Sequence, residues 1–157
     1  MKTSKPTIPT DFVAIHDVFQ EGQLRSWRMV HAVMIETYLA IGAILSRKTR
    51  ENGWTDVDIQ KLSDWLIRTT PTGMTFTASN LRHMKQFHEV WNGKAEFHAR
   101  LCELSWPCHL ILLEHCNSDR DREIYLVAAL NGKWTRKELE SRLRAGEGGR
   151  AATRSGS

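Results

Sequence analysis

Cysteine, proline and long apolar runs are all scarce in this sequence. The 157 residues include three cysteines and four prolines. An odd number of cysteines without a Cys-x-x-Cys pair argues against a disulfide framework and favours a reducing compartment. No apolar run approaches the ~18 residues that a membrane-spanning helix needs, because Glu36 interrupts the longest candidate, residues 32–45. Since the first ten residues also lack the apolar core of a secretory signal, we expect a cytoplasmic protein with no membrane segment.

Signatures of catalysis are missing as well. The sequence has no glycine-rich phosphate loop, no serine in a Gly-x-Ser-x-Gly turn and no Glu-x-Lys or Asp-x-Lys on a predicted strand. Its two carboxylate clusters, within residues 56–58 and 119–123, each stand at the start of a predicted helix. Capping and the helix dipole already account for carboxylates in that position. The sequence therefore predicts a chain that is not an enzyme and that uses no cofactor.

One stretch, residues 98–116, is rich in histidine and cysteine. His98 and Cys102 are four residues apart, so one helix face can present both to a metal ion. However, Cys102, Cys108 and Cys116 lie within apolar runs, where free cysteine behaves as a small buried hydrophobe. We therefore expect no metal site.

The charge of the chain is modest and evenly spread. Twenty-two lysines and arginines against 18 acidic residues give a net charge of +4 and a sequence pI near 9.1. That balance is compatible with a nucleic-acid-binding protein and equally with a neutral globular domain. Evidence for a nucleic-acid site must therefore come from the placement of individual side chains.

Helical periodicity runs through most of the sequence, and no segment alternates as a strand does. The length suits a single domain, so we expect one all-α, compact multi-helix domain over residues 10–145. A flexible polar arm, residues 1–9, is expected before it. A disordered tail rich in Gly, Ala, Ser and Arg, residues 146–157, is expected after it.

The first half of this domain begins with two predicted helices, a short one that ends at Gly22 and a long one over residues 24–48. Apolar residues of the long helix recur every three or four positions, which predicts a helix buried on most sides. The mid-helix Gly42 is expected to allow close packing of another backbone. Basic residues at the end of this helix, within residues 47–50, suit the helix dipole, and contact with a phosphate is the alternative.

Two further helices, joined by a Pro/Gly break, resemble a helix-turn-helix. The first runs from Thr55 to Arg68 and the second from Thr77 to Trp91, each with a threonine as its N-cap. The break between them, residues 69–76, is longer than the three or four residues of the standard turn. Three shorter helices are predicted at 94–104, 106–115 and 119–131, and a last one starts at a capping box at Thr135. These last four belong to the same expected domain.

The second helix of that pair carries the candidate nucleic-acid contacts. Leu81, Met84, His88 and Trp91 share one face and are expected to pack against the body of the domain. The opposite face is polar and offers donors and acceptors that suit base edges and phosphates. A solvated amphipathic surface explains the same pattern, and that alternative stays open. The candidate DNA-binding residues are Ser79, Asn80, Arg82, His83, Lys85 and Gln86.

Four ordered motifs resemble the amino-terminal domain of the YhcG family. They are YLAIG at residues 38–42, FTASNLRHMKQF at 76–87, LSWPCHLILL at 104–113, and REIYL at 122–126 continuing to WTRKELE at 134–140. The resemblance covers residues 24–145 clearly and the preceding residues 10–23 weakly. In that family a PD-(D/E)XK nuclease module follows this domain.

The resemblance implies a helical, helix-turn-helix-like module that helps a nuclease to find or hold nucleic acid. The family's cleavage activity is not carried over to these residues. We therefore expect a non-catalytic module that binds nucleic acid, with duplex DNA and a PD-(D/E)XK nuclease as its partners. The alternative is a protein-interaction domain or homodimer that uses the long helix, residues 24–48, across a two-fold axis. The two functions are compatible, since helix-turn-helix proteins often act as dimers.

Overall fold

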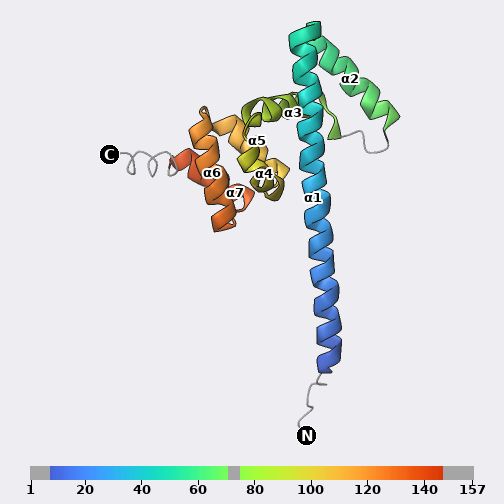
Figure 1. Ribbon diagram of the computed structural model, residues 1–157, viewed down its shortest axis with the longest axis vertical. Helices are drawn as coiled ribbons and strands as arrows, with labels where there is room; N and C mark the ends of the chain where they lie inside the picture. Colours follow the sequence, from blue (N-terminus) through green and yellow to red (C-terminus); the bar gives the residue numbers. More distant parts are fainter. Residues whose placement is uncertain (1–7, 71–74, 147–157) are drawn as a thin grey trace.

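Helices alone make up the part of the chain that the structure describes, residues 8–70 and 75–146. This computed structural model has no strand within those residues, so the predicted all-α class is confirmed. Figure 1 shows a long rod, α1, with the other helices gathered beside the half that ends at α2. The helices are α1 (Thr10–Asn52), α2 (Asp56–Thr69), α3 (Ala78–Trp91), α4 (His98–Glu103), α5 (Trp106–His115), α6 (Asp119–Gly132) and α7 (Arg136–Ala145), and a short 3-10 turn (Ala95–Phe97) precedes α4.

The first and last helices of the described residues begin and end near the residues at which the domain was predicted to begin and end. The first helix begins at Thr10, and the last one ends at Ala145, where Gly146 takes a positive φ of 69°. Only residues 8 and 9 of the predicted arm and Gly146 of the predicted tail are described. The rest of both segments, and residues 71–74 of the predicted break, lie outside the described residues.

The longest helix differs from the prediction. The sequence predicts a helix that ends at Gly22 and a second that starts at Leu24, whereas α1 is continuous from Thr10 to Asn52. Glycine inside a helix costs only about 1 kcal/mol relative to alanine, and good helix formers surround this one on both sides. The Ser26 hydroxyl donates a hydrogen bond to the carbonyl oxygen of Gly22 at 3.0 Å, within the same helical turn. A single glycine was therefore too weak a signal for a helix end.

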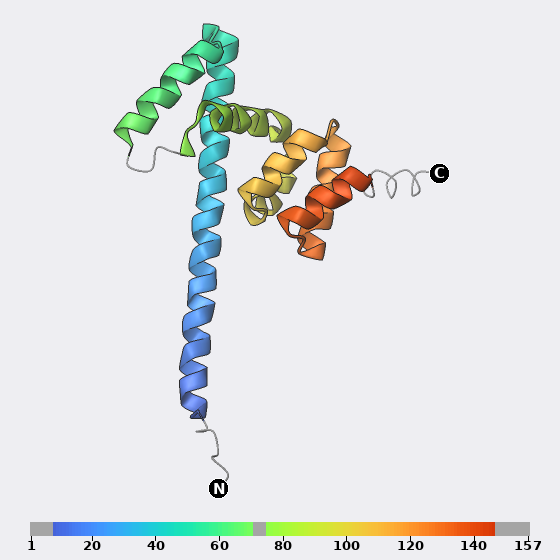
Figure 2. The same ribbon diagram turned by 180° about the vertical axis from the view of Figure 1, so that it is seen from behind.

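The C-terminal half of α1 crosses α3 at close range. A β-carbon on Gly42 would lie 2.1 Å from the backbone oxygen of Met84, so only glycine fits at this crossing. The predicted role of Gly42 is confirmed. Buried Ile35 and Leu45 flank it along α1, and Figure 2 shows α3 lying across the rod at this level. The contact therefore fixes α3, and with it the candidate binding face, on the domain.

The centre of the core lies where α1, α3 and α5 meet. Trp106 is buried as predicted, and its ring meets those of Tyr38 and Phe87 edge to face at centroid distances of 4.8 and 5.2 Å. Fully buried His109 donates from Nε2 to the carbonyl oxygen of Leu101 at 2.8 Å. Burial lowers the pKa of His109 to about 4, so its ring is neutral at pH 7.

Capping residues set the predicted helix starts. The backbone N–H of Thr55 donates to the Asp58 carboxylate at 2.8 Å, which completes a capping box at the start of α2. Thr135 and Glu138 form the same box at the start of α7, with the Thr135 N–H 3.0 Å from the Glu138 carboxylate. The Thr77 hydroxyl accepts a backbone N–H of α3 at 3.1 Å. These local signals were legible in the sequence because each involves residues three positions apart.

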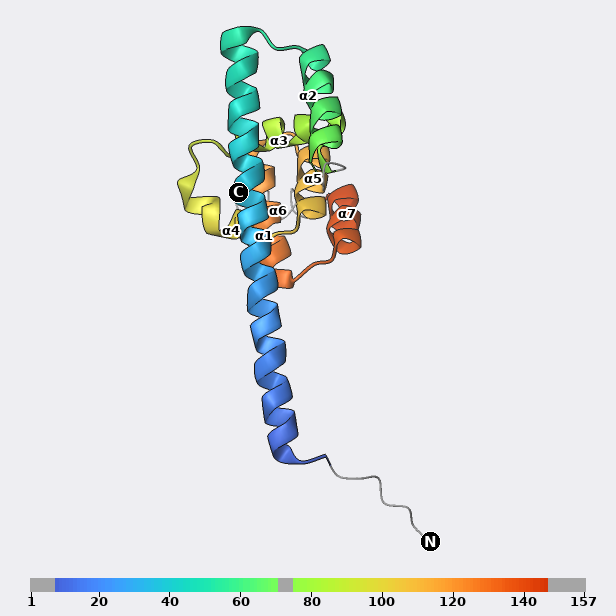
Figure 3. The ribbon, with the colours of Figure 1, turned by 90° about the vertical axis from the view of Figure 1, so that its right-hand side faces the viewer.

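The N-terminal half of α1 extends beyond the rest of the domain, as Figure 3 shows. The expectation that residues 24–48 are buried on most sides is wrong, because even from Ile35 onward α1 is buried along one face and Ile44 on another face stays 49% exposed. The residues just before Ile35 still face the domain, because His31 Nε2 lies 2.8 Å from the Leu104 carbonyl oxygen and Trp27, Met29 and Ala32 line a cavity with α4 and α6. The large apolar side chains left exposed before Ile35 are Phe12, Val13, Ile15, Val18, Phe19, Leu24, Trp27, Met29, Val30 and Val33.

This helix is also a candidate membrane span by length and composition. One 18-residue window reaches a mean hydropathy of 1.6, and 28% of that window is buried inside the protein. The evidence is weak, because the core helix of a soluble protein and a signal sequence meet the same criteria. The described residues thus give no clear signal of a membrane protein.

Candidate nucleic-acid interface

A groove separates the start of α2 from the exposed side of α3. It has a volume of about 430 Å³, and the end of α1 closes one side of it. The Ser63 hydroxyl of α2 donates to the Phe76 carbonyl oxygen at 2.7 Å, which ties α2 to the segment that leads into α3. The residues that line the groove are Thr49, Trp54, Thr55, Asp56, Ile59, Arg82, Lys85, Gln86 and Glu89.

Three of the six candidate DNA-binding residues line this groove together. Arg82 and Gln86 are exposed and lie one helical turn apart, and half-buried Lys85 is beside them. The Arg82 guanidinium is 3.7 Å from the carboxylate of Asp56, and the Lys85 ammonium is 3.2 Å from that of Glu89. Each cation of the groove is therefore matched by one carboxylate.

The other three candidates lie at different places on α3. Ser79 is exposed in the first turn, and His83 is half-buried. The amide of Asn80 is used inside the protein, because it donates to the Thr75 carbonyl oxygen at 2.7 Å and accepts the indole N–H of Trp106 at 2.9 Å. Sequence reasoning missed this role, since the contact joins residues 26 positions apart. Asn80 serves the fold rather than the groove.

The inner face of α3 is close to the one predicted. Leu81, Met84 and Trp91 are buried, as expected. The fourth position is corrected, because Phe87 is fully buried whereas His88 is only half-buried. The large side chains of α3 that pack into the core therefore all lie on its inner face, and none lies on its polar face.

The last turns of α1, which carry the predicted basic cluster, form one side of the groove through Thr49. Arg47 and Arg50 are exposed, and Thr49 lines the groove itself. The Ser46 hydroxyl of the same turn donates to the Glu89 carboxylate at 3.0 Å, which holds that carboxylate close to α1. Of the predicted cluster at residues 47–50, Thr49 lines the groove, whereas Arg47 and Arg50 are exposed on α1 and do not line it.

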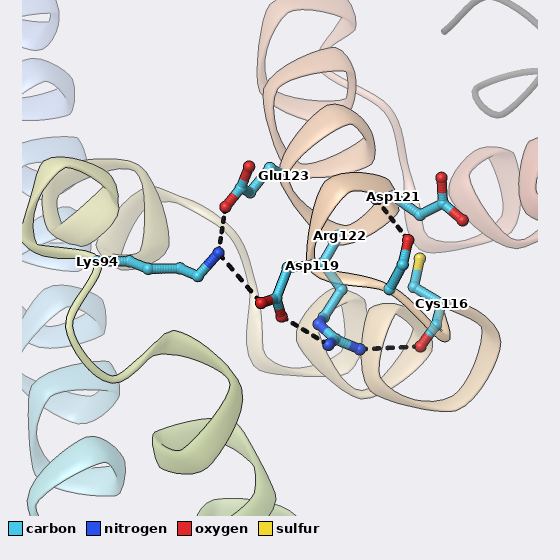
Figure 4. Close-up of polar contacts among 7 residues, drawn as sticks. Lys94, Cys116, Asp119, Asp121, Arg122 and Glu123 are labelled. Atoms are coloured by element: carbon cyan, nitrogen blue, oxygen red, sulfur yellow. Dashed lines mark hydrogen bonds and ion pairs between the residues drawn. The ribbon is translucent and has the colours of Figure 1, made fainter. Parts of the chain in front are cut away.

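The carboxylates at the start of α6 are held by cations of the protein itself. Figure 4 shows Lys94 between the carboxylates of Glu123 and Asp119, and Arg122 between Asp119 and the Cys116 carbonyl oxygen. The hydrogen bond from Lys94 to Glu123 raises the pKa of Lys94, and the one from Arg122 lowers the pKa of Asp119. These contacts tie the segment after α3 to α6. The expected position of the cluster at a helix start is confirmed, because Asp119 and Asp121 lie in the first turn of α6, after the N-cap Ser118.

A third polar group joins α1 to α4. His98 Nε2 lies 3.2 Å from the Glu36 carboxylate, and Cys102 Sγ lies 3.9 Å from the same nitrogen. The three potential ligand atoms fall within 4.8 Å of one another. Sequence spacing could show only the His98–Cys102 pair, since Glu36 is 62 positions away from His98. The exposed histidine–glutamate contact is itself an adequate reason for this arrangement.

Comparison with known proteins identifies a family for most of this chain. The model of the DUF1016 N-terminal domain matches residues 14–147. The YhcG family is the DUF1016 family, so the resemblance seen in the four sequence motifs is confirmed. The match concerns the N-terminal domain, and no nuclease domain is matched. No curated protein and no solved structure matches significantly.

Proposed function

Since the chain belongs to the family of DUF1016 N-terminal domains, we propose that it is a non-catalytic module that binds duplex DNA through the exposed side of α3. The observation that supports this proposal is the position of Arg82, Lys85 and Gln86 along one groove, on a helix whose opposite side is core. The pair of cations suits phosphates, and the amide suits a base edge.

The carboxylates of the groove compete with DNA phosphates for the two cations. The ion pair of Arg82 with Asp56 is largely open to solvent, and such a pair contributes at most about 1 kcal/mol, whereas the Lys85–Glu89 pair is half-buried. A DNA phosphate carries a full negative charge and releases condensed counterions when a cation neutralises it. Arg82 therefore exchanges its carboxylate for a phosphate at small cost, whereas Lys85 must leave a carboxylate that Ser46 also holds.

A PD-(D/E)XK nuclease is the partner that this proposal assigns to the module. In the division of labour that follows, the helical domain holds DNA and the nuclease, in the same chain or in a separate one, cuts it. None of the carboxylate clusters of the described residues is needed for cleavage in this scheme. In this scheme the cations of α3 contribute affinity by contacting phosphates, and Gln86 contributes sequence preference by contacting a base edge.

The test is the salt dependence of binding to a short duplex, measured by fluorescence anisotropy. The double variant Arg82→Ala/Lys85→Ala should bind more weakly, and its plot of log K against log salt should be flatter by about 0.9 for each phosphate that the variant no longer neutralises. The matched control is Arg136→Ala/Lys137→Ala, which removes the same charge from exposed positions on α7. The control should keep the slope of the unmodified protein.

A third variant separates sequence preference from charge. Gln86→Ala should leave the salt slope unchanged and reduce discrimination between duplexes, because a neutral amide releases no counterions. If the Arg82/Lys85 variant folds normally and binds with unchanged affinity and slope, α3 does not contact DNA. An equal weakening of binding in the α7 control would mean that binding depends on overall charge alone.

A further inference from the structure

The exposed half of α1 carries a continuous apolar stripe that the domain does not cover. We define this outer stripe as the residues that recur at spacings of three and four along one face of the exposed half. At 100° per residue it lies about half a turn round the helix from Ile35, through which α1 packs on the domain. The members of the outer stripe are Phe12, Ile15, Phe19, Gly22, Ser26, Val30 and Val33.

The large members of this stripe are strongly exposed. Phe12, Ile15, Phe19, Val30 and Val33 each leave between 60% and 69% of their surface open. Contiguous apolar surface of this extent, repeated at a coiled-coil spacing, is typical of a helix that pairs with another helix. The stripe is separate from the DNA-binding groove, which lies at the other end of α1.

The middle of the stripe is hollow. Gly22 and Ser26 are its two small residues, and a β-carbon on Gly22 would meet nothing within 4 Å. Large side chains before and after them, among them Phe19, Trp27 and Val30, surround a shallow depression of about 700 Å³. Small residues at the crossing of two helices allow their backbones to approach closely, as Gly42 does within the domain.

The charges of this half of α1 change sign at the same point. Asp11, Asp17 and Glu21 precede Gly22, and Arg25 and Arg28 follow it. A second copy that runs parallel would place each acidic segment beside an identical acidic segment. A copy that runs antiparallel places the acidic segment of each helix beside the basic segment of the other.

From these observations we infer that α1 pairs with α1 of a second copy, antiparallel, with the two-fold axis between Gly22 and Gln23. In this register Phe12 lies opposite Val33, Ile15 opposite Val30, and Phe19 opposite the small Ser26 of the other copy. The positions of the stripe are symmetrical about the midpoint between Gly22 and Gln23, as a two-fold axis requires. The pairing is independent of DNA binding and places two domains at opposite ends of one two-helix rod.

The first test is the oligomeric state of the full chain by sedimentation equilibrium. The unmodified protein should form dimers at micromolar concentration, and Phe19→Lys should raise the dissociation constant at least about tenfold. Leu24→Lys is the matched control, because Leu24 is also exposed and lies on the opposite side of the helix from the stripe. This control should dimerise like the unmodified protein. A monomer at 100 μM, or equal effects of the two lysines, would overturn the proposal.

The second test is the direction of pairing. Chains with Ile15→Cys and chains with Val30→Cys should form a disulfide with each other on mild oxidation, and Ile15→Cys chains alone should not cross-link to themselves. Unmodified protein, which keeps Cys102, is the background control. Self-linking of Ile15→Cys chains would show a parallel pair and contradict the assignment. Sedimentation of monomer with phosphatidylcholine vesicles, without dimers in their absence, would show instead that the stripe binds lipid.

Discussion

The two halves of α1 are one continuous helix with opposite environments. In the half nearer the C-terminal end, Ile35, Tyr38 and Leu45 are buried by the rest of the domain. In the other half, apolar residues such as Phe12 and Phe19 are equally frequent and remain exposed. An apolar helical stripe therefore shows that a surface is to be covered, but it does not show which molecule covers it.

The two glycines of α1 differ in the same way as the two halves, since one is covered by the domain and the other is not. Gly42 lies against the carbonyl oxygen of Met84, whereas Gly22 faces open space. The sequence predicted Gly42 as a mid-helix glycine, whereas it predicted Gly22 as the end of a helix. We interpret Gly42 as the crossing point of α3 and Gly22 as the crossing point of a second copy of α1.

The largest expected effect in the buried half is that of Trp106→Ala. This change removes the ring that joins Tyr38 of α1 to Phe87 of α3, together with the hydrogen bond to Asn80. Truncation of a buried tryptophan should lower the free energy of unfolding by about 3–5 kcal/mol, a large share of the stability of a domain of this size. Urea denaturation measures it, and a loss below about 1 kcal/mol would contradict the central position of Trp106.

A pH effect of slightly smaller size is expected from the same core. His109 has a pKa of about 4 in the folded chain against 6.5 in the unfolded chain, mainly because of burial. Protonation would also place a proton on Nδ1, which has no hydrogen-bond partner. The unfolded state therefore binds the proton more readily, so stability is complete above pH 6.5, falls as the pH drops toward 4, and levels off below.

The whole step should amount to at most about 3–4 kcal/mol, since each pKa unit corresponds to about 1.4 kcal/mol. Urea denaturation at a series of pH values between 7 and 4 measures it. His109→Phe should remove the step, whereas His98→Gln, a change at an exposed position, should leave it in place. A step of the same size in the His109→Phe variant would assign it to another group.

Replacing each of the two glycines by alanine should change the stability of the protein in opposite directions. Gly42→Ala forces α3 away from α1 and should lower the free energy of unfolding by about 1–3 kcal/mol. Gly22→Ala meets no atom of its own chain and should raise the helix stability of the monomer by up to about 1 kcal/mol. Thermal unfolding at low protein concentration compares the two, and a loss of stability in both variants would remove the distinction between the halves.

Sequence reasoning succeeded where a structural signal is local. The starts of α2, α3 and α7 follow from threonine caps, and the exposed face of α3 follows from its periodicity. The position of Gly42 at a close crossing was also foreseeable, because a glycine that lowers helix stability in the middle of an apolar helix usually has a packing role. The family match agrees with the order of the motifs.

Features that depend on contacts between residues far apart in the chain could not be predicted from the sequence. The amide of Asn80 looks like a base-reading group until Trp106 is placed beside it. Glu36 joins His98 only because α4 packs on α1. Phe87 took the core position expected for His88 because α5 brings Trp106 to that side of α3. The division of α1 into a covered and an uncovered half likewise depends on where α3 and α4 come to lie.

Hydrogen exchange along α1 at two protein concentrations tests the central claim most directly. At nanomolar concentration the amides of residues 12–33 should exchange rapidly, and those of residues 35–48 should be protected by the domain. At 100 μM the first segment should become protected as the second copy covers the outer stripe, with no change in the second segment. Exchange of residues 12–33 that is the same at both concentrations would contradict the account.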